Sequence, residues 1–129
     1  MSYYINTIVK NTGFDEAVVK VTEELKKEGF GVLTEINVSE TLKKKIDVDF
    51  KKYKILGACN PQFAYKALSS EDKIGVFLPC NVIVEEHDNG EVEVSAVDPI
   101  ASMMSVKNDK LGDLASEIKQ KLIRVINNL

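Results

Sequence analysis

The chain has few of the residues that usually build covalent or metal-stapled folds. Its 129 residues include two cysteines, one histidine and no tryptophan. Two cysteines are too few for a disulfide-built scaffold, and neither has the close Cys or His neighbours that a structural zinc site uses, so no metal site is expected. With 7 glycines and 3 prolines, the composition also excludes a fibrous or low-complexity chain.

Long apolar runs and a strong net charge are missing as well. The longest mostly apolar stretch, Ile74–Val84, contains a proline and an asparagine and is too short to span a bilayer. The first residues lack the basic and apolar segments of a secretory signal, and a net charge of −3 gives no general attraction to nucleic acid or to anionic membranes. We therefore expect one cytoplasmic domain, residues 1–129, that binds neither a membrane nor a nucleic acid.

Two hydrophobic periods alternate along the chain and predict a mixed architecture. The expected strands are Tyr3–Lys10, Phe30–Ser39, Tyr53–Cys59, Cys80–His87 and Glu91–Val97. The expected helices run from Phe14 to a left-handed Gly29, over Glu40–Ile46, over Gln62–Leu68 and onward from a capping Asn108, with Ser69–Phe77 irregular. In the second strand, simple alternation puts Phe30, Val32, Ile36 and Val38 on one side.

The register of the last two strands follows from their turn. A two-residue Asn89-Gly90 turn would mix polar and apolar residues on one face, whereas a three-residue Asp88-Asn89-Gly90 loop keeps each face coherent. The three-residue loop predicts the opposite pairs His87/Glu91, Val82/Ala96, Val84/Val94, Glu85/Glu93 and Cys80/Asp98. The two glutamates repel across the outer face, at a cost of a few tenths of a kcal/mol or so.

Each cysteine is followed by an asparagine at a predicted strand end. Asn60 and Pro61 are typical of a helix start, so Cys59 is expected to precede a helix whose N-terminal partial charge favours its thiolate. If the third and fourth strands pair, Cys59, Cys80 and Asp98 meet at one edge. The alternative is that both thiols only pack, because free cysteine behaves as a small hydrophobe.

Other polar groups offer weaker signals. His87 lies an odd number of residues from Cys80 and roughly 20 Å along the strand, so we expect a solvent-facing residue paired with Glu91 and not a ligand beside the thiols. The lysines between residues 43 and 54 fit either an anion-binding edge or a solvated face. Met103 and Met104 either border one of the candidate surfaces or fill gaps in the core, which is the commoner use of methionine in a loop before a helix, and they are assigned no role. No recognisable catalytic motif is present, so enzymatic activity and any cofactor are left open.

Several segments in order resemble the domain of unknown function 302 family. These are Glu28–Glu35, Ile55–Pro61, Leu78–Val82 and Asp98-Pro99. The resemblance implies a two-layer α+β domain related to the TATA-binding-protein-like fold, with a curved antiparallel sheet in β-α-β-β-β-β-α order, a long C-terminal helix and often a homodimer. It implies no activity, and a likeness in fold is not an argument for DNA binding.

Three functions from different classes fit the sequence. The first is binding of a small ligand or cofactor beside the C-terminal helix, at Cys59, Asn60, Cys80, Asn81 and Asp98. The second is a thiol redox protein, with Cys59 as the attacking thiol and Cys80 as its resolving partner, which requires Cα atoms within about 7 Å. The third is a dimeric interaction module whose interface includes Ile83 and Val97.

Overall fold

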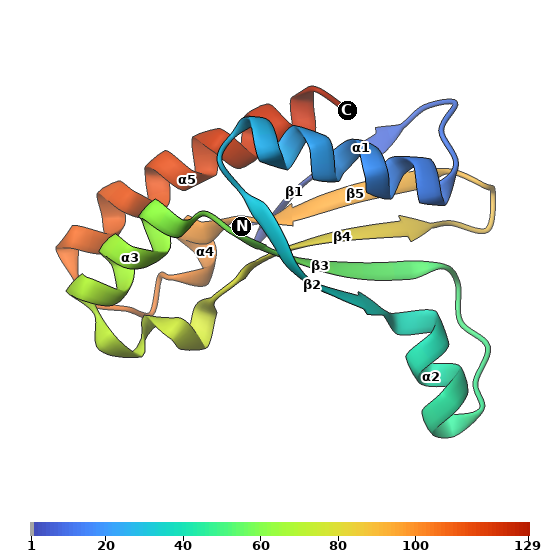
Figure 1. The fold of residues 1–129 in the computed structure, drawn as a ribbon, viewed down its shortest axis with the longest axis horizontal. Coiled ribbons are helices and arrows are strands. Elements are labelled where there is room, and N and C mark those ends of the chain that lie inside the picture. Colours follow the sequence, from blue (N-terminus) through green and yellow to red (C-terminus); the bar gives the residue numbers. More distant parts are fainter. Residues whose placement is uncertain (1) are drawn as a thin grey trace.

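The five predicted strands form one antiparallel sheet in the order β1-β5-β4-β3-β2. In this computed structural model, which describes residues 2–129, the strands are β1 (Tyr4–Val9), β2 (Gly31–Asn37), β3 (Tyr53–Cys59), β4 (Cys80–Glu86) and β5 (Val92–Val97). The helices are α1 (Phe14–Lys27), α2 (Val38–Ile46), α3 (Pro61–Ser70), the 3₁₀ helix η1 (Asp72–Phe77), α4 (Pro99–Ser102) and α5 (Asp109–Asn127). The predicted α+β architecture with a long C-terminal helix is confirmed (Figure 1).

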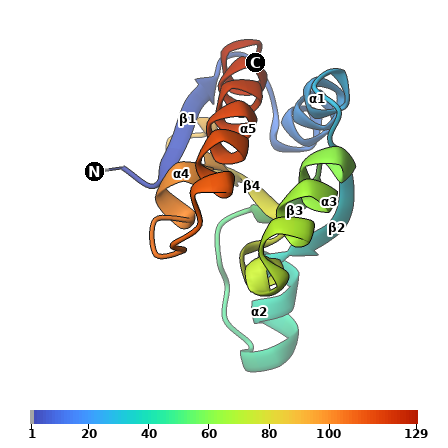
Figure 2. The same ribbon diagram turned by 90° about the vertical axis from the view of Figure 1, so that its left-hand side faces the viewer.

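The core lies between one face of the sheet and the long helices. Alternate strand residues such as Leu56, Val82 and Val94 are fully buried, and they meet apolar stripes on α1 and α5 (Figures 1 and 2). The helical stripes include Val21, Leu25, Ile118 and Leu122. Burying each such side chain stabilises the fold by roughly 1.5–3 kcal/mol. The other strand residues therefore form the opposite surface, called the outer face here.

The β4–β5 hairpin has the register that its turn predicts. The opposite pairs include Val82/Ala96, Val84/Val94 and Glu85/Glu93. The His87 N–H donates to the Glu91 carbonyl at 2.8 Å, and Gly90 adopts the left-handed conformation with φ of 86°. This register confirms the three-residue loop. Glycine suits the left-handed position because only a residue without a Cβ enters that conformation at little cost.

Strand β2 departs from simple alternation. Val32 is opposite Ala58, but the pairing then shifts, so that Thr34 is opposite Gly57 and Ile36 is opposite Ile55. This bulge moves Ile36 to the outer face, and the prediction that it shares a side with Val32 is wrong. One extra residue in a strand reverses the parity of everything after it.

The helix ends follow their capping residues. Asn60 and Asn108 cap α3 and α5 as predicted. The second strand was predicted too long. It ends at Asn37, whose side chain caps α2 by accepting a hydrogen bond from the Glu40 N–H. The segment predicted to be irregular contains η1, and α4 was not predicted. No helix within residues 2–129 combines the length and apolar character that crossing a bilayer requires.

Candidate functional site

The two Cys-Asn segments lie side by side, at the end of β3 and the start of β4. Ala58 is opposite Cys80, and Gly57 is opposite Asn81. A Cβ on Gly57 would collide with Thr34 Oγ1 and lie 2.9 Å from Cγ of the proline that precedes Cys80. The strand pairing predicted for these segments is therefore confirmed, and close packing of the Thr34 and Pro79 side chains accounts for the glycine.

The two thiols have different surroundings. Both are free, but Cys80 is 5% exposed on the core face and Cys59 is half-buried. Burial raises the pKa of the Cys80 thiol to about 11, and the nearby Cys59 adds to the rise. Diagonal neighbours on paired strands have Cα atoms about 6 Å apart, within disulfide reach, but strand alternation directs these two side chains to opposite faces. Little of the Cys80 thiol is ionised at neutral pH.

The asparagines that follow the thiols have different surroundings. Asn60 accepts a hydrogen bond from the Phe63 N–H at 3.3 Å and donates to the Glu28 carbonyl at 3.4 Å, so it joins the start of α3 to the end of α1. Asn81 is exposed on the outer face of β4. The hydrogen bonds of Asn60 are those of a structural cap.

Asp98 holds the C-terminal part of the fold together. Its carboxylate accepts hydrogen bonds from the Ile100 and Ala101 N–H groups and lies 2.9 Å from the Lys119 ammonium. Burial acts to raise the pKa of Asp98, but the hydrogen bond from Lys119 and those from the backbone outweigh it and lower the pKa. The β4–β5 ladder begins at Val82, so Cys80 and Asp98 lie outside it. Asp98 thus ties α4 to α5.

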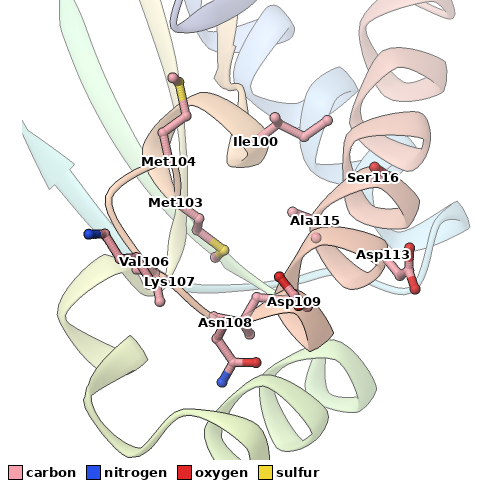
Figure 3. Close-up of a pocket in the computed structure, with 12 residues that line it drawn as sticks. Ile100, Met103, Met104, Val106, Lys107, Asn108, Asp109, Asp113, Ala115 and Ser116 are labelled. Carbon is pink, nitrogen blue, oxygen red and sulfur yellow. The ribbon is translucent and has the colours of Figure 1, made fainter.

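A pocket of about 720 Å³ lies beside Asp98, between α4, the loop that follows it and the first turns of α5 (Figure 3). Met103 is buried and Met104 is 64% exposed, and both border the opening. The lining residues are Ile100, Met103, Met104, Val106, Lys107, Asn108, Asp109, Leu111, Gly112, Asp113, Ala115 and Ser116. We call it the methionine pocket. It has the size of a small-molecule site.

Charged side chains stand at the edge of the methionine pocket. Asp109 and Asp113 are exposed one turn apart on α5, and Lys107 is exposed in the loop. Figure 3 shows the Asp109 carboxylate directed toward Met103 and the Lys107 ammonium directed away from Ser116. Sequence reasoning did not identify this site, because it assigned the two methionines no role. The available signal was a Met-Met pair between Pro99, a helix-starting proline, and the cap of the last helix.

The remaining polar signals resolve into local pairs. Lys43, Lys51 and Lys54 each contact a carboxylate at 2.7–3.0 Å. Their partners are Asp47, Glu85 and Glu35, in that order. These contacts neutralise part of the basic segment, while Lys44, Lys45 and Lys52 are exposed. The His87 N–H pairs with Glu91 as predicted, while its ring lies 2.7 Å from Glu93 on the outer face.

Comparisons with known proteins give a family and no activity. The family model "Domain of unknown function DUF302" matches residues 5–129. A crystal structure of an uncharacterized conserved DUF302 protein from Bacillus stearothermophilus is similar, with a TM-score of 0.91, 30% sequence identity and 98% of each chain covered. A comparison with curated proteins finds no match. The sequence resemblance is confirmed, and the chain belongs to the DUF302 family.

Proposed function

We propose that this protein binds a small amphipathic ligand in the methionine pocket, next to Asp98. The observation that supports the proposal is the pocket itself, whose volume of about 720 Å³ lies within the roughly 300–1,000 Å³ typical of small-molecule sites. The pocket lies beside the C-terminal helix, where the sequence-based expectation placed a site. The ligand contacts proposed here differ from those predicted from the sequence, because the pocket is lined by none of Cys59, Asn60, Cys80, Asn81 and Asp98.

The floor of the methionine pocket favours an apolar body. Ile100, Val106 and Leu111 contribute branched side chains, and the two methionines contribute flexible thioethers that adapt to varied shapes. Ile100 and Met104 are 39% and 64% exposed, so a ligand can cover apolar surface that now faces water. Each buried methylene of the ligand contributes about 0.8 kcal/mol.

The edge of the pocket favours a cationic head group. Asp109 and Asp113 stand on the same side of α5, because residues four apart are neighbours on a helix. Within residues 2–129, neither carboxylate takes part in an ion pair of 4.0 Å or less. With the Lys107 ammonium directed away, the charged group that Figure 3 shows directed toward Met103 is the Asp109 carboxylate. The ligand class is therefore an apolar chain or ring that carries an amine or quaternary ammonium.

A pair of oppositely charged probes tests this function. Decyltrimethylammonium and decanoate have similar apolar chains, and ¹³C-methyl labels on Met103 and Met104, assigned by Met→Leu variants, report on the pocket directly. We expect saturable shifts of both methyl resonances with decyltrimethylammonium and at least about threefold weaker binding of decanoate. Asp109→Asn should weaken binding of the cation, and the control variant Asp47→Asn, at the residue that follows α2, should not.

Two results would count against the proposal. If neither methyl resonance shifts in a saturable way, the pocket does not take this class of ligand. If decanoate binds as tightly as the cation, the charge of the head group is assigned wrongly.

The redox alternative has less structural support. A resolving thiol must ionise to attack, and burial raises the pKa of Cys80 to about 11. Strand alternation also points the two side chains to opposite faces of the sheet. The Cα spacing of Cys59 and Cys80 is compatible with a disulfide. A Cys59–Cys80 redox couple is disfavoured by the direction and burial of the side chains.

A homodimer is the second candidate, and helix α2 favours it. None of the nine residues of α2 is buried, and the helix extends past one end of the sheet (Figure 1). Ile46, Val48 and Phe50 are 64%, 42% and 46% exposed. A helix this short is marginal without packing, so we infer that a second copy covers these side chains. Ile83 and Val97, named from the sequence, are half-buried. Sedimentation of the wild type and of Phe50→Glu distinguishes a dimer from a monomer.

A further inference from the structure

Three metal-ligating side chains meet on the outer face, near the β4–β5 turn. Glu85 and Glu93 are direct cross-strand partners, and His87 follows two residues after Glu85, so alternation puts all three on one side. Their ligand atoms lie within 4.8 Å of one another, and all three residues are half-buried. The β4–β5 turn is at the opposite end of the molecule from α4, so the group is separate from the methionine pocket (Figure 1).

The cluster is held from several sides. His87 Nε2 lies 2.7 Å from Glu93 Oε1, while Asn6 donates to Glu93 Oε2 at 2.5 Å. Lys51 Nζ lies 2.7 Å from Glu85 Oε1. Burial acts to raise the pKa of Glu93, but the hydrogen bonds from Asn6 and His87 outweigh it and lower the pKa. Asn6 holds Glu93 Oε2, and Glu93 Oε1 faces the imidazole.

We propose that Glu85, His87 and Glu93 bind a divalent transition-metal ion of the Zn²⁺ type. One imidazole and two carboxylates are donors that zinc accepts, and three protein ligands leave a fourth position for water. Ligand atoms at about 2.0 Å from a tetrahedral ion lie about 3.3 Å apart. The ligand atoms of Glu85, His87 and Glu93 already lie within 4.8 Å of one another, so small side-chain rotations bring them to that spacing. The Asn6 hydrogen bond is the kind of outer contact that orients a ligating carboxylate.

A bound ion also relieves an electrostatic conflict in the sheet. Glu85 and Glu93 repel each other directly across two strands, and Lys51 contacts Glu85 while the His87 ring contacts Glu93. A divalent cation between the two carboxylates would be attracted by both, while Lys51 competes with it for Glu85 Oε1. We therefore expect removal of the lysine charge to strengthen metal binding.

The test is Zn²⁺ titration of the full chain against a fluorescent chelator, with NMR of the imidazole. His87 is the only histidine, so its ring resonances are unambiguous. We expect one Zn²⁺ per chain, a saturable change of the His87 resonances, and at least about tenfold weaker binding in His87→Gln and Glu93→Gln. Lys51→Met should bind more tightly than the wild type.

Two matched variants control for other binding sites. Glu86 lies between Glu85 and His87 in the sequence but on the other face of β4. Glu86→Gln removes its charge and should leave Zn²⁺ binding unchanged. Cys59→Ser removes the more accessible thiol, and should also leave it unchanged. Binding of much less than one equivalent, binding that survives both His87→Gln and Glu93→Gln, or binding that Cys59→Ser abolishes would overturn the proposal. Circular dichroism of each variant confirms that loss of binding is not loss of fold.

Discussion

The Cys-Asn segments and the methionine pocket are built in opposite ways. The Cys-Asn segments are conspicuous in the sequence, yet the structure shows two paired strands in which Gly57 leaves no room for a side chain and Cys80 is buried. The methionine pocket is marked in the sequence only by two adjacent methionines, yet it offers a cavity of about 720 Å³ with charged residues at its edge. Unusual residues in a strand can therefore reflect tight packing, while a binding site arises where a loop and a helix end leave space.

The largest expected effect comes from adding a side chain where the Cys-Asn segments pack. Gly57→Val should lower the free energy of unfolding by about 3 kcal/mol, because its side chain collides with Thr34 and the proline before Cys80. Gly112→Ala at the methionine pocket should instead raise it by roughly 0.5–1 kcal/mol, since a Cβ there meets nothing within 4 Å and alanine favours the helix. Urea denaturation measures both. Equal effects at the two glycines would remove the contrast in packing.

The thiols give the next largest effect, as a difference in rate. Burial raises the pKa of Cys80 to about 11, so near pH 8 only about one thiol in a thousand is ionised. Alkylation of Cys80 by iodoacetamide should therefore be at least about 100-fold slower in the folded protein than in denaturant. Mass spectrometry of the alkylated peptides measures the rates. Rapid labelling of Cys80 in the folded state would restore the redox alternative.

Asp98 should show a smaller effect that depends on pH. Its pKa is lower in the folded protein, so its charge stabilises the fold above the unfolded pKa of about 3.9, and this contribution is lost as the pH falls through the folded pKa. Asp98→Asn keeps a capping side chain but loses the ionic contact with Lys119. We expect it to lose about 1 kcal/mol at neutral pH and to match the wild type in acid. Urea denaturation at both pH values tests this, and a difference that persists in acid would contradict it.

Local patterns explain why much of the fold was predictable. The hairpin register follows from the turn length that keeps each strand face coherent, and the caps at Asn60 and Asn108 are one-residue signals. The bulge in β2 was missed because it depends on pairing with β3, which the strand's own sequence does not encode. The methionine pocket was missed because its walls come from the relative placement of α4 and α5.

The metal-ligating cluster could have been found from the sequence. The predicted register already placed Glu85 opposite Glu93, and equal parity puts His87 on the same face as Glu85. Comparing His87 only with Cys80 hid that relation. The useful question for a lone histidine is therefore which side chains share its face on the neighbouring strand, and not only which cysteines lie near it in sequence.

The most direct test of the central claim compares one pocket variant with one thiol variant. Binding of decyltrimethylammonium, followed at the Met103 and Met104 methyl groups, should weaken about threefold in Asp109→Asn and stay at the wild-type level in Cys59→Ser. That result would place ligand binding in the methionine pocket. Unchanged binding in Asp109→Asn together with loss of binding in Cys59→Ser would contradict the account and return the site to the Cys-Asn segments.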